Sequence, residues 1–277
     1  MTLRISVVQT DPKLGATAGN LDTMVAAVES ADAELVVFPE CALSGYGFAS
    51  KDEAWPFAEL VPGPATERLV DASKRTGRWS IAGMLERDGD DLFNAAVLMG
   101  PDGVAGVYRK NHLPFLGVDR FVTQGNHGFP VFDTPLGKIG ILICFDLSFP
   151  EAARCLKLGG AQVICVPTNW PMAAAVSCEH APPVRAQENH VWIVTADRVG
   201  EESGFAFRGR SRICDPDGHV IVQAGDGLEV ITADVDPAVA NENRTVIVPG
   251  EYELDRMGQR RPEYYAAISD PDERISS

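Results

Sequence analysis

The sequence predicts an α/β fold with mixed β-sheets. Apolar stretches at residues 3–9 and 34–38 lie on either side of residues 20–31, where apolar side chains recur at helix spacing. A strand, a helix and a strand joined by short links are typical of a βαβ unit. Further strand-like stretches meet at Pro101-Asp102-Gly103, a sequence that favours a tight turn. Because hairpins accompany the βαβ unit, we expect sheets that mix parallel and antiparallel strands.

Two pairs of segments resemble each other along the chain. ELVVFPE, which begins at residue 34, resembles AQVICVPTN, which begins at residue 161. MGPDGVAGVY, from residue 99, resembles CDPDGHVIVQ, from residue 214. Such repetition indicates a duplicated half, so we expect two related sheets packed together rather than a single sheet.

The remaining elements follow from local patterns. Residues 64–77 are expected to form a helix, and another helix is expected to begin at Pro150, since proline is favoured in a first helical turn. Residues 173–189 are expected to be helical with interruptions, because Pro182 and Pro183 lack the backbone N–H that a helix interior needs. Short β-branched or apolar stretches predict strands at residues 79–85, 93–99, 104–108, 138–143, 162–167, 190–196, 211–214, 220–222 and 229–233, the last strand of the chain.

The composition excludes several classes of protein. The chain has 277 residues, 45% of them hydrophobic, which is ordinary for a globular protein with a sizeable core. Its net charge of −15 argues against a nucleic-acid partner. No stretch has the apolar length of a membrane span, and no signal-peptide pattern opens the sequence, so we expect a cytoplasmic protein. The six cysteines are scattered without a CxxC pair, which predicts neither a disulfide framework nor a zinc site.

The chain is expected to hold one domain and an extension. Residues 1–247 contain all of the expected strands and helices. From residue 248 onward the sequence is polar and loses its periodicity. Residues 248–277 are therefore expected to form a C-terminal extension that packs on another surface, such as that of a partner subunit.

Three chemically useful residues come at the ends of expected strands. Glu40, Lys110 and Cys144 each follow such a strand, and open α/β sheets place their ligands at this edge. Cys144 lies between a strand and the helix expected from Pro150, where helix amides are expected to favour the thiolate. Taken alone, each residue has a plainer interpretation: an exposed loop glutamate, a surface lysine and a small core cysteine.

Three segments resemble the signature segments of the nitrilase (carbon–nitrogen hydrolase) superfamily: FPE with Glu40, YRKNHLPF with Lys110 and ILICFDLSFPE with Cys144. PTNWP, RAQENHVWIVTADRVG, FRGRS and DPDG also resemble its amidase branches, so the resemblance covers roughly residues 3–236. It implies a four-layer αββα sandwich of two mixed β-sheets flanked by helices. It also implies homodimers or higher homo-oligomers, with no metal or organic cofactor.

The resemblance also implies roles for the strand-end residues. Cys144 would be the nucleophile, Glu40 the proton shuttle, and Lys110 the cation beside the oxyanion, helped by the backbone N–H of Phe145. Many members carry a second glutamate, and the position that aligns with it here holds Val118. The nearest acid is Asp119, which either substitutes from a shifted loop or forms an ion pair with Arg120 or another loop base.

The expected substrate is a small-molecule amide. True nitrilases of the superfamily usually follow the cysteine with Trp-Glu, whereas this chain has Phe145-Asp146, which favours an amidase. An N-carbamoyl amidohydrolase is the nearest alternative; a nitrilase and a non-catalytic binding protein are less favoured. A Cys-His hydrolase that uses His112 or His190 would leave Glu40 and Lys110 unexplained. The candidate pocket residues are Tyr46, Phe145, Asn169 and Trp170, although Trp170 could simply pack in the core and Asp197 could be structural.

Overall fold

The computed structural model describes residues 2–269 and divides into two compact units, Met1–Asn241 and Glu242–Ser277. The first unit thus ends before the boundary at residue 247 that the sequence suggested. In the second unit, β15 (Arg244–Val248) pairs with β16 (Tyr252–Asp255) as an antiparallel hairpin. The prediction that residues 229–233 are the last strand is therefore wrong. The apolar run at the end of β15 and the Pro249-Gly250 turn were local signals for this hairpin.

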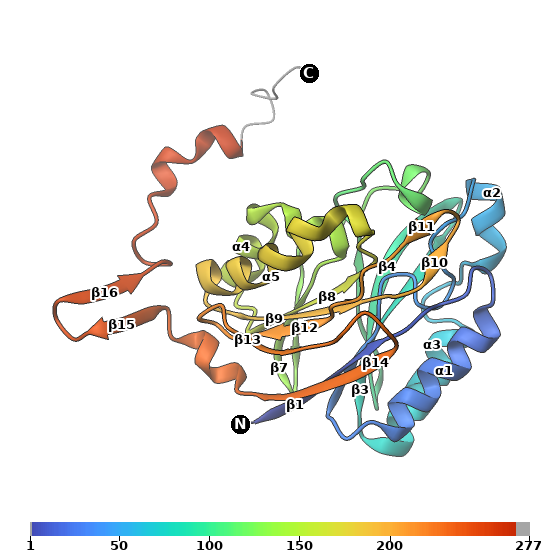
Figure 1. Cartoon of the computed structure of the whole chain (residues 1–277), viewed down its shortest axis with the longest axis horizontal. Helices are drawn as coiled ribbons and strands as arrows, with labels where there is room; N and C mark the ends of the chain where they lie inside the picture. The colour runs from blue at the N-terminus through green and yellow to red at the C-terminus, as the bar shows by residue number, and fades with distance from the viewer. Residues whose placement is uncertain (1, 270–277) are drawn as a thin grey trace. The chain divides into compact units, whose positions relative to one another are not determined.

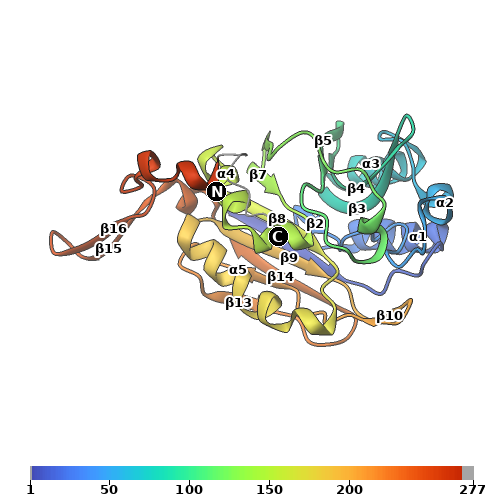
Figure 2. The ribbon, with the colours of Figure 1, turned by 90° about the horizontal axis from the view of Figure 1, so that it is seen from above.

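The first unit is built on two six-stranded mixed sheets. The first sheet has the order β14-β1-β2-β3-β4-β5: Glu229–Val235, Leu3–Gln9, Leu35–Val37, Trp79–Asp88, Asp91–Gly100 and Gly103–Arg109. The second has the order β13-β12-β9-β8-β7-β6: Val220–Gln223, Arg212–Cys214, Trp192–Asp197, Val163–Thr168, Gly137–Ile141 and Val131–Thr134. Figures 1 and 2 show the two sheets face to face between two layers of helices. The predicted αββα sandwich is confirmed.

Alternation along the strands explains this layering. Ile5 and Val7 on β1 belong to a large core cluster that also contains apolar side chains of β7, β8 and β9 in the other sheet. Val8, also on β1, belongs instead to a cluster with Leu21 and Leu69 on the helices. Successive strand residues point to opposite faces, so one strand supplies both the sheet-to-sheet and the sheet-to-helix core.

Helices cover the outer faces of the two sheets (Figure 2). α1 (Thr17–Ser30) and α3 (Pro64–Thr76) pack on the first sheet, while α4 (Pro150–Leu158) and α5 (Ala175–Asn189) cover the second. α3 begins with Pro64 and ends at Gly77 in the left-handed conformation, the expected start and stop signals. The remaining short elements are α2 (Lys51–Ala54) and a small hairpin of β10 (Glu201–Glu202) and β11 (Phe205–Ala206). No helix of the described chain is long and apolar enough to cross a membrane.

α5 corrects one expectation, because Pro182 and Pro183 lie inside a continuous helix. A proline at position 183 leaves the carbonyl oxygen of Glu179, four residues earlier, without its helical N–H donor. The buried Arg212 donates from Nη1 to this oxygen at 3.1 Å. A side chain from the neighbouring strand β12 thus satisfies the carbonyl that the proline leaves free, a contact that helix propensity alone cannot predict.

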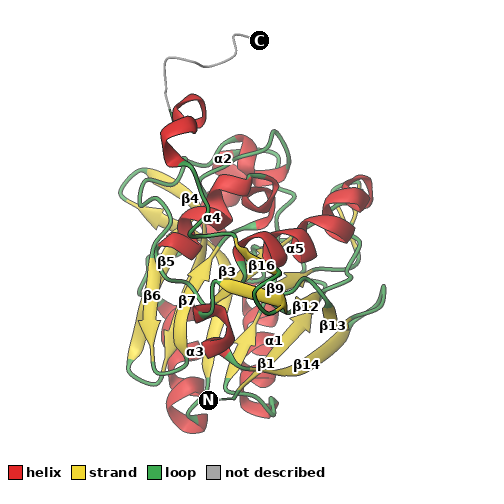
Figure 3. Ribbon diagram, turned by 90° about the vertical axis from the view of Figure 1, so that its left-hand side faces the viewer, coloured by secondary structure: helices red, strands yellow, loops and turns green. Residues whose placement is uncertain are grey.

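The two sheets also account for the internal resemblance of the sequence. β2 and β8, which carry one pair of similar segments, each lie between two parallel neighbours in the interior of a sheet. The two PDG turns each join an antiparallel pair, β4 to β5 and β12 to β13. β6, which the sequence analysis missed, is a short, half-buried strand at the edge of the second sheet beside β7 (Figure 3).

Candidate active site

Strand direction brings the predicted residues of the first sheet to one edge. β2 runs parallel to β3, and β5 runs antiparallel to β4, which is itself antiparallel to β3. β2 and β5 therefore point the same way, and Glu40 and Lys110 follow their carboxyl ends. On β3, a side chain at Gly83 would meet the backbone of Pro39 and Cys41 at 2.3–2.6 Å. Only glycine allows the Glu40 segment to lie this close to the sheet.

A buried network joins the two residues. Lys110 donates from Nζ to Glu40 Oε1 at 2.6 Å and to Asp119 Oδ2. Asn94, near the start of β4, donates from Nδ2 to Glu40 Oε1 at 2.7 Å and to Asp119 Oδ1 at 2.8 Å. The hydroxyl of Tyr46 donates to Asp119 Oδ2 at 2.8 Å. Asp119 is therefore part of this network and pairs with Lys110 rather than with Arg120.

Burial and neighbouring charges set the protonation of these groups. Burial raises the pKa of Glu40, and the ammonium of Lys110 acts in the opposite direction. Burial by itself would lower the pKa of Lys110, but the carboxylates of Asp119 and Glu40 raise it well above its ordinary value. The lysine therefore stays charged, while the glutamate is a stronger base than an exposed one. Its second oxygen, Oε2, has no hydrogen-bond partner among the described residues.

Cys144 comes from the second sheet. It opens a short 3₁₀ turn, Cys144–Ser148, just after β7, and its φ of 46° lies in the left-handed region that non-glycine residues rarely adopt. Such strained residues cluster at functional sites. The Cys144 residue keeps 8% of its surface exposed, whereas Glu40 and Lys110 each keep 1%. Of the three residues, Cys144 is thus the most exposed.

The protonation of Cys144 differs from expectation. Burial raises the pKa of its thiol far above the ordinary value; the charge of Glu40 raises it further, and the ammonium of Lys110 acts in the opposite direction. The hydroxyl of Thr168 and the backbone N–H of Asn169 also favour the thiolate without offsetting burial. The expected help from a helix N-terminus is wrong, because the 3₁₀ turn separates the thiol from α4. Burial thus favours the protonated thiol over the thiolate.

Unpartnered polar atoms lie at the ends of β8 and β9. Both side-chain atoms of Asn169 and Oδ2 of Asp197 are buried without a hydrogen-bond partner among the described residues. The other oxygen of Asp197 accepts hydrogen bonds from the backbone N–H of Trp170 at 3.0 Å and of Arg198 at 2.9 Å. Asp197 thus orders the backbone beside the site, and Asn169 can still bind a polar ligand.

The other candidate pocket residues lie in different settings. Tyr46 is buried, with its hydroxyl bound to Asp119 and its ring 5.9 Å from Lys110 Nζ. Trp170 is buried in the core cluster shared by the two sheets. Phe145 is half-buried and packs edge-on against Phe149, with ring centroids 5.2 Å apart.

A family model described as carbon-nitrogen hydrolase matches residues 4–245. The chain belongs to the carbon–nitrogen hydrolase family. It is 39% identical over 268 residues to a nitrilase of Pyrococcus abyssi, covering 95% of this chain and 99% of that one. It is 33% identical to an (R)-stereoselective amidase of a Pseudomonas species, covering 93% and 97%. The crystal structure of a carbon–nitrogen hydrolase from Helicobacter pylori matches its fold with a TM-score of 0.86 at 23% identity, covering 98% and 99%.

Family membership confirms the resemblance drawn from the sequence. The site of this carbon–nitrogen hydrolase also contains Asn94, a residue that the sequence analysis missed. Asn94 contacts both Glu40 and Asp119, and its backbone oxygen accepts from the N–H of Lys110 at 2.8 Å. A signal was present, since Asn94 is a polar residue within the apolar stretch LFNAAVLM. A buried amide in a strand needs partners, and here they are the charged groups of the site.

The arrangement favours Glu40 over a histidine as the base. His112 Nδ1 lies 2.7 Å from Asp146 Oδ1, and its ring stacks on Phe149 with centroids 3.8 Å apart. His190 lies at the C-terminal end of α5. Among the described residues, no cluster of histidine, cysteine and acidic side chains suited to a metal ion was found. The charged side chains that most influence the pKa of the Cys144 thiol are Glu40 and Lys110.

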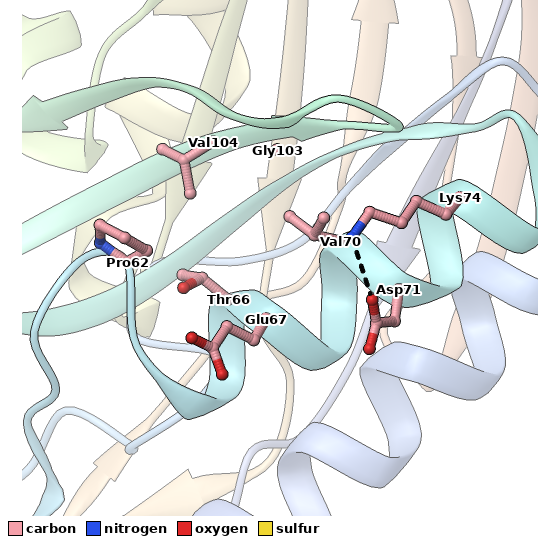
Figure 4. A pocket seen from close by; sticks show the side chains of 8 residues that line it. All are labelled: Pro62, Thr66, Glu67, Val70, Asp71, Lys74, Gly103 and Val104. Atoms are coloured by element: carbon pink, nitrogen blue, oxygen red, sulfur yellow. Dashed lines mark hydrogen bonds and ion pairs between the residues drawn. The ribbon is translucent and has the colours of Figure 1, made fainter.

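A separate surface pocket of about 620 Å³ lies between α3 and the β4–β5 turn (Figure 4). Its lining residues are Pro62, Thr66, Glu67, Val70, Asp71, Lys74, Gly103 and Val104. Figure 4 shows Asp71 and Lys74 facing each other across one turn of α3, with Nζ and Oδ1 3.3 Å apart. None of these residues belongs to the Glu40–Lys110–Asp119 network, so this pocket is distinct from the candidate active site.

Proposed function

We propose that this carbon–nitrogen hydrolase is a cysteine-dependent amidase that converts a linear amide of a small molecule into a carboxylate and ammonia. The observation that carries the proposal is the buried ion pair of Glu40 and Lys110, whose two charges both act on the pKa of the Cys144 thiol. A thiol with a raised pKa is a poor nucleophile until a base takes its proton. Glu40 Oε2 is an unpartnered oxygen of a carboxylate whose pKa is itself raised, which suits it to that step.

Acylation needs a proton to move twice. Glu40 takes the proton of Cys144 while sulfur attacks the amide carbon, and the carbonyl oxygen becomes an oxyanion. Two of the three Lys110 N–H donors go to Glu40 and Asp119, and the third is the donor we assign to the oxyanion, together with the backbone N–H of Phe145. Glu40 then gives its proton to the amide nitrogen as the C–N bond breaks. Ammonia leaves and a thioester remains on Cys144.

Deacylation uses the same groups in reverse. Glu40 takes a proton from water, the hydroxide oxygen attacks the thioester carbon, and Lys110 again faces the oxyanion. The C–S bond breaks, Glu40 returns the proton to sulfur, and the carboxylic acid leaves. Water is consumed once per ammonia released, and no further reactant is needed. Asn169, with both side-chain atoms unpartnered, is the residue we propose to bind a polar part of the substrate.

Substrate class is tested with a panel of short linear amides, the matching nitriles and N-carbamoyl amino acids. Since one relative bears the name nitrilase and another the name amidase, both groups belong in the panel. We expect ammonia and the carboxylate to appear in equal amounts from at least one amide, with kcat/KM at least about tenfold above that for its nitrile. Turnover of nitriles or N-carbamoyl compounds alone would contradict the amidase proposal.

Replacing Asp119 by asparagine is expected to move the pH profile of kcat/KM toward lower pH. The charge of Asp119 raises the pKa of both Glu40 and Lys110, so its removal lowers both. Activity needs ionised Glu40 and is lost as pH falls through that pKa, so the acid limb shifts downward. It also needs charged Lys110, so the alkaline limb shifts the same way. Asp102→Asn, at an exposed carboxylate in the β4–β5 turn, is the control. Limbs that stay in place, or move to higher pH, argue against this role.

We also propose that the enzyme works in the cytoplasm as a homodimer or higher homo-oligomer. Six cysteines without a disulfide fit a reducing compartment. The β15–β16 hairpin supports assembly, because none of the described residues in its unit is buried, and a lone two-stranded hairpin is marginally stable in water. Light scattering after size-exclusion chromatography tests this, and a monomer at micromolar concentration would contradict it.

A further inference from the structure

Asp146 is a fully buried carboxylate two residues beyond Cys144 that accepts four hydrogen bonds. Its Oδ2 accepts from the backbone N–H of Ile143 at 3.0 Å and from the hydroxyl of Tyr108 at 2.7 Å. Its Oδ1 accepts from the backbone N–H of His112 at 3.0 Å and from His112 Nδ1 at 2.7 Å. Both oxygens are satisfied, as a buried carboxylate requires.

The donors come from the two halves of the site. Tyr108 lies near the end of β5 in the first sheet, and His112 follows that strand. Residues two positions before and two positions after Lys110 therefore bind the same carboxylate. Ile143 and Asp146 itself belong to the turn after β7 of the second sheet. Glu40, Lys110 and Asp119 come from the first sheet and its loops, while Cys144 comes from the second. Asp146 therefore ties the lysine segment to the thiol turn across the two sheets.

We propose that Asp146 is a positioning residue that fixes the place of Cys144 relative to Lys110 and Glu40. This inference rests on the amidase function proposed above and deepens it. Misplacing reacting groups by about 1 Å can cost on the order of 10²-fold in rate. The carboxylate makes no contact with Glu40 or Lys110 among its four hydrogen bonds, so its effect passes through Tyr108, His112 and the turn.

The geometry also gives His112 a role. A carboxylate only accepts, so Nδ1 of His112 carries the proton that faces Asp146. The ring is held between this bond and the stacking contact with Phe149. His112 thus supports Asp146 instead of acting on the thiol.

The main test is Asp146→Asn. The amide keeps the size of the side chain but has one acceptor oxygen, so its NH₂ group must face donors on one side. With the best amide of the panel, kcat is expected to fall by about 10²-fold while KM changes by less than about threefold. Alkylation of Cys144 by iodoacetamide, followed by mass spectrometry of the peptide that contains it, is expected to slow by about tenfold. Asp133→Asn, an exposed carboxylate on β6 of the second sheet, is the matched control and should change neither.

A double-mutant cycle separates positioning from a general loss of stability. Tyr108→Phe removes one donor and is expected to lower kcat by about three- to tenfold with KM unchanged. Because the hydroxyl acts through Asp146, the Tyr108→Phe, Asp146→Asn double variant should lose no more than Asp146→Asn alone, within about twofold. Losses that multiply would overturn the proposal. A lower thermal midpoint with unchanged kcat and alkylation would overturn it as well.

The remaining outcomes are also decisive. If Asp146→Asn does not fold, Tyr108→Phe decides: a loss in kcat at constant KM supports the proposal, and an unchanged kcat contradicts it. Cys144→Ala distinguishes this inference from the proposed function. If Cys144→Ala is inactive while Asp146→Asn is fully active, only the positioning role fails. If Cys144→Ala keeps hydrolysing the amide, the amidase mechanism itself fails.

Discussion

Replacing Cys144 by alanine is expected to lower amide hydrolysis by on the order of 10⁴-fold or more. No thioester can form without the thiol, and Glu40 and Lys110 alone offer a base and a cation without a nucleophile. The protein should still fold, because the lost sulfur is small and stability should change by about 1 kcal/mol. Ammonia release and thermal unfolding are the measurements. Cys155→Ala, at an exposed cysteine on α4, is the control and should keep full activity.

Substantial activity in Cys144→Ala would show that Cys144 is not the nucleophile. Residual turnover above about 1% of wild type, with a preparation that contains no wild-type enzyme, would be enough to do so. Serine at position 144 is expected to be nearly as inactive, because Glu40 would then have to deprotonate an alcohol, whose pKa is well above that of a thiol.

Glu40→Gln is expected to reduce kcat by about 10³-fold while the network around it persists. The glutamine oxygen can still accept from Lys110 Nζ and Asn94 Nδ2, which bind a single oxygen of the glutamate. What disappears is the group that takes the proton of Cys144, and burial holds that proton firmly. The variant should therefore fold, bind substrate with a similar KM and turn over slowly.

The matched control for Glu40→Gln is Glu67→Gln, an exposed glutamate of α3 that lines the separate pocket of Figure 4. It should leave kcat unchanged. An active Glu40→Gln enzyme whose activity disappears when His112 or His190 is also replaced would favour a histidine base instead.

Much of the fold could be predicted from the sequence, since hydrophobic period and turn residues determine the strands of both sheets. The helix of residues 175–189 shows the limit of such prediction. Pro182 and Pro183 predicted a break, but the helix is continuous, and Arg212 on β12 donates to the carbonyl oxygen that Pro183 leaves without a helical donor. Likewise, β6 and the β15–β16 hairpin are short or exposed elements with weak apolar patterns. Local patterns predict the secondary structure that a segment favours, and long-range contacts decide where the observed structure differs.

The residues of the candidate site could likewise be predicted only where local sequence patterns indicate them. Glu40, Lys110 and Cys144 could be proposed because each closely follows a strand and lies in a segment that resembles a signature segment of the family. Asp119 was ambiguous, since a shift of one residue in a loop decides whether its carboxylate reaches Lys110, and sequence spacing does not fix loop geometry. Asn94 and the contacts of Asp146 could not be predicted, because they depend on how β4 and the two sheets are placed.

The central claim is that Cys144 becomes acylated, and trapping tests it most directly. The wild-type enzyme is mixed with an excess of the p-nitrophenyl ester of the acid released from the best amide, quenched in acid within milliseconds, and examined by intact-mass and peptide mass spectrometry. An activated ester makes deacylation the slow step, so we expect one acyl group per chain on the peptide containing Cys144, removed by neutral hydroxylamine and absent from Cys144→Ala. An enzyme that hydrolyses its amide with no adduct, or with an adduct on another residue, would contradict it.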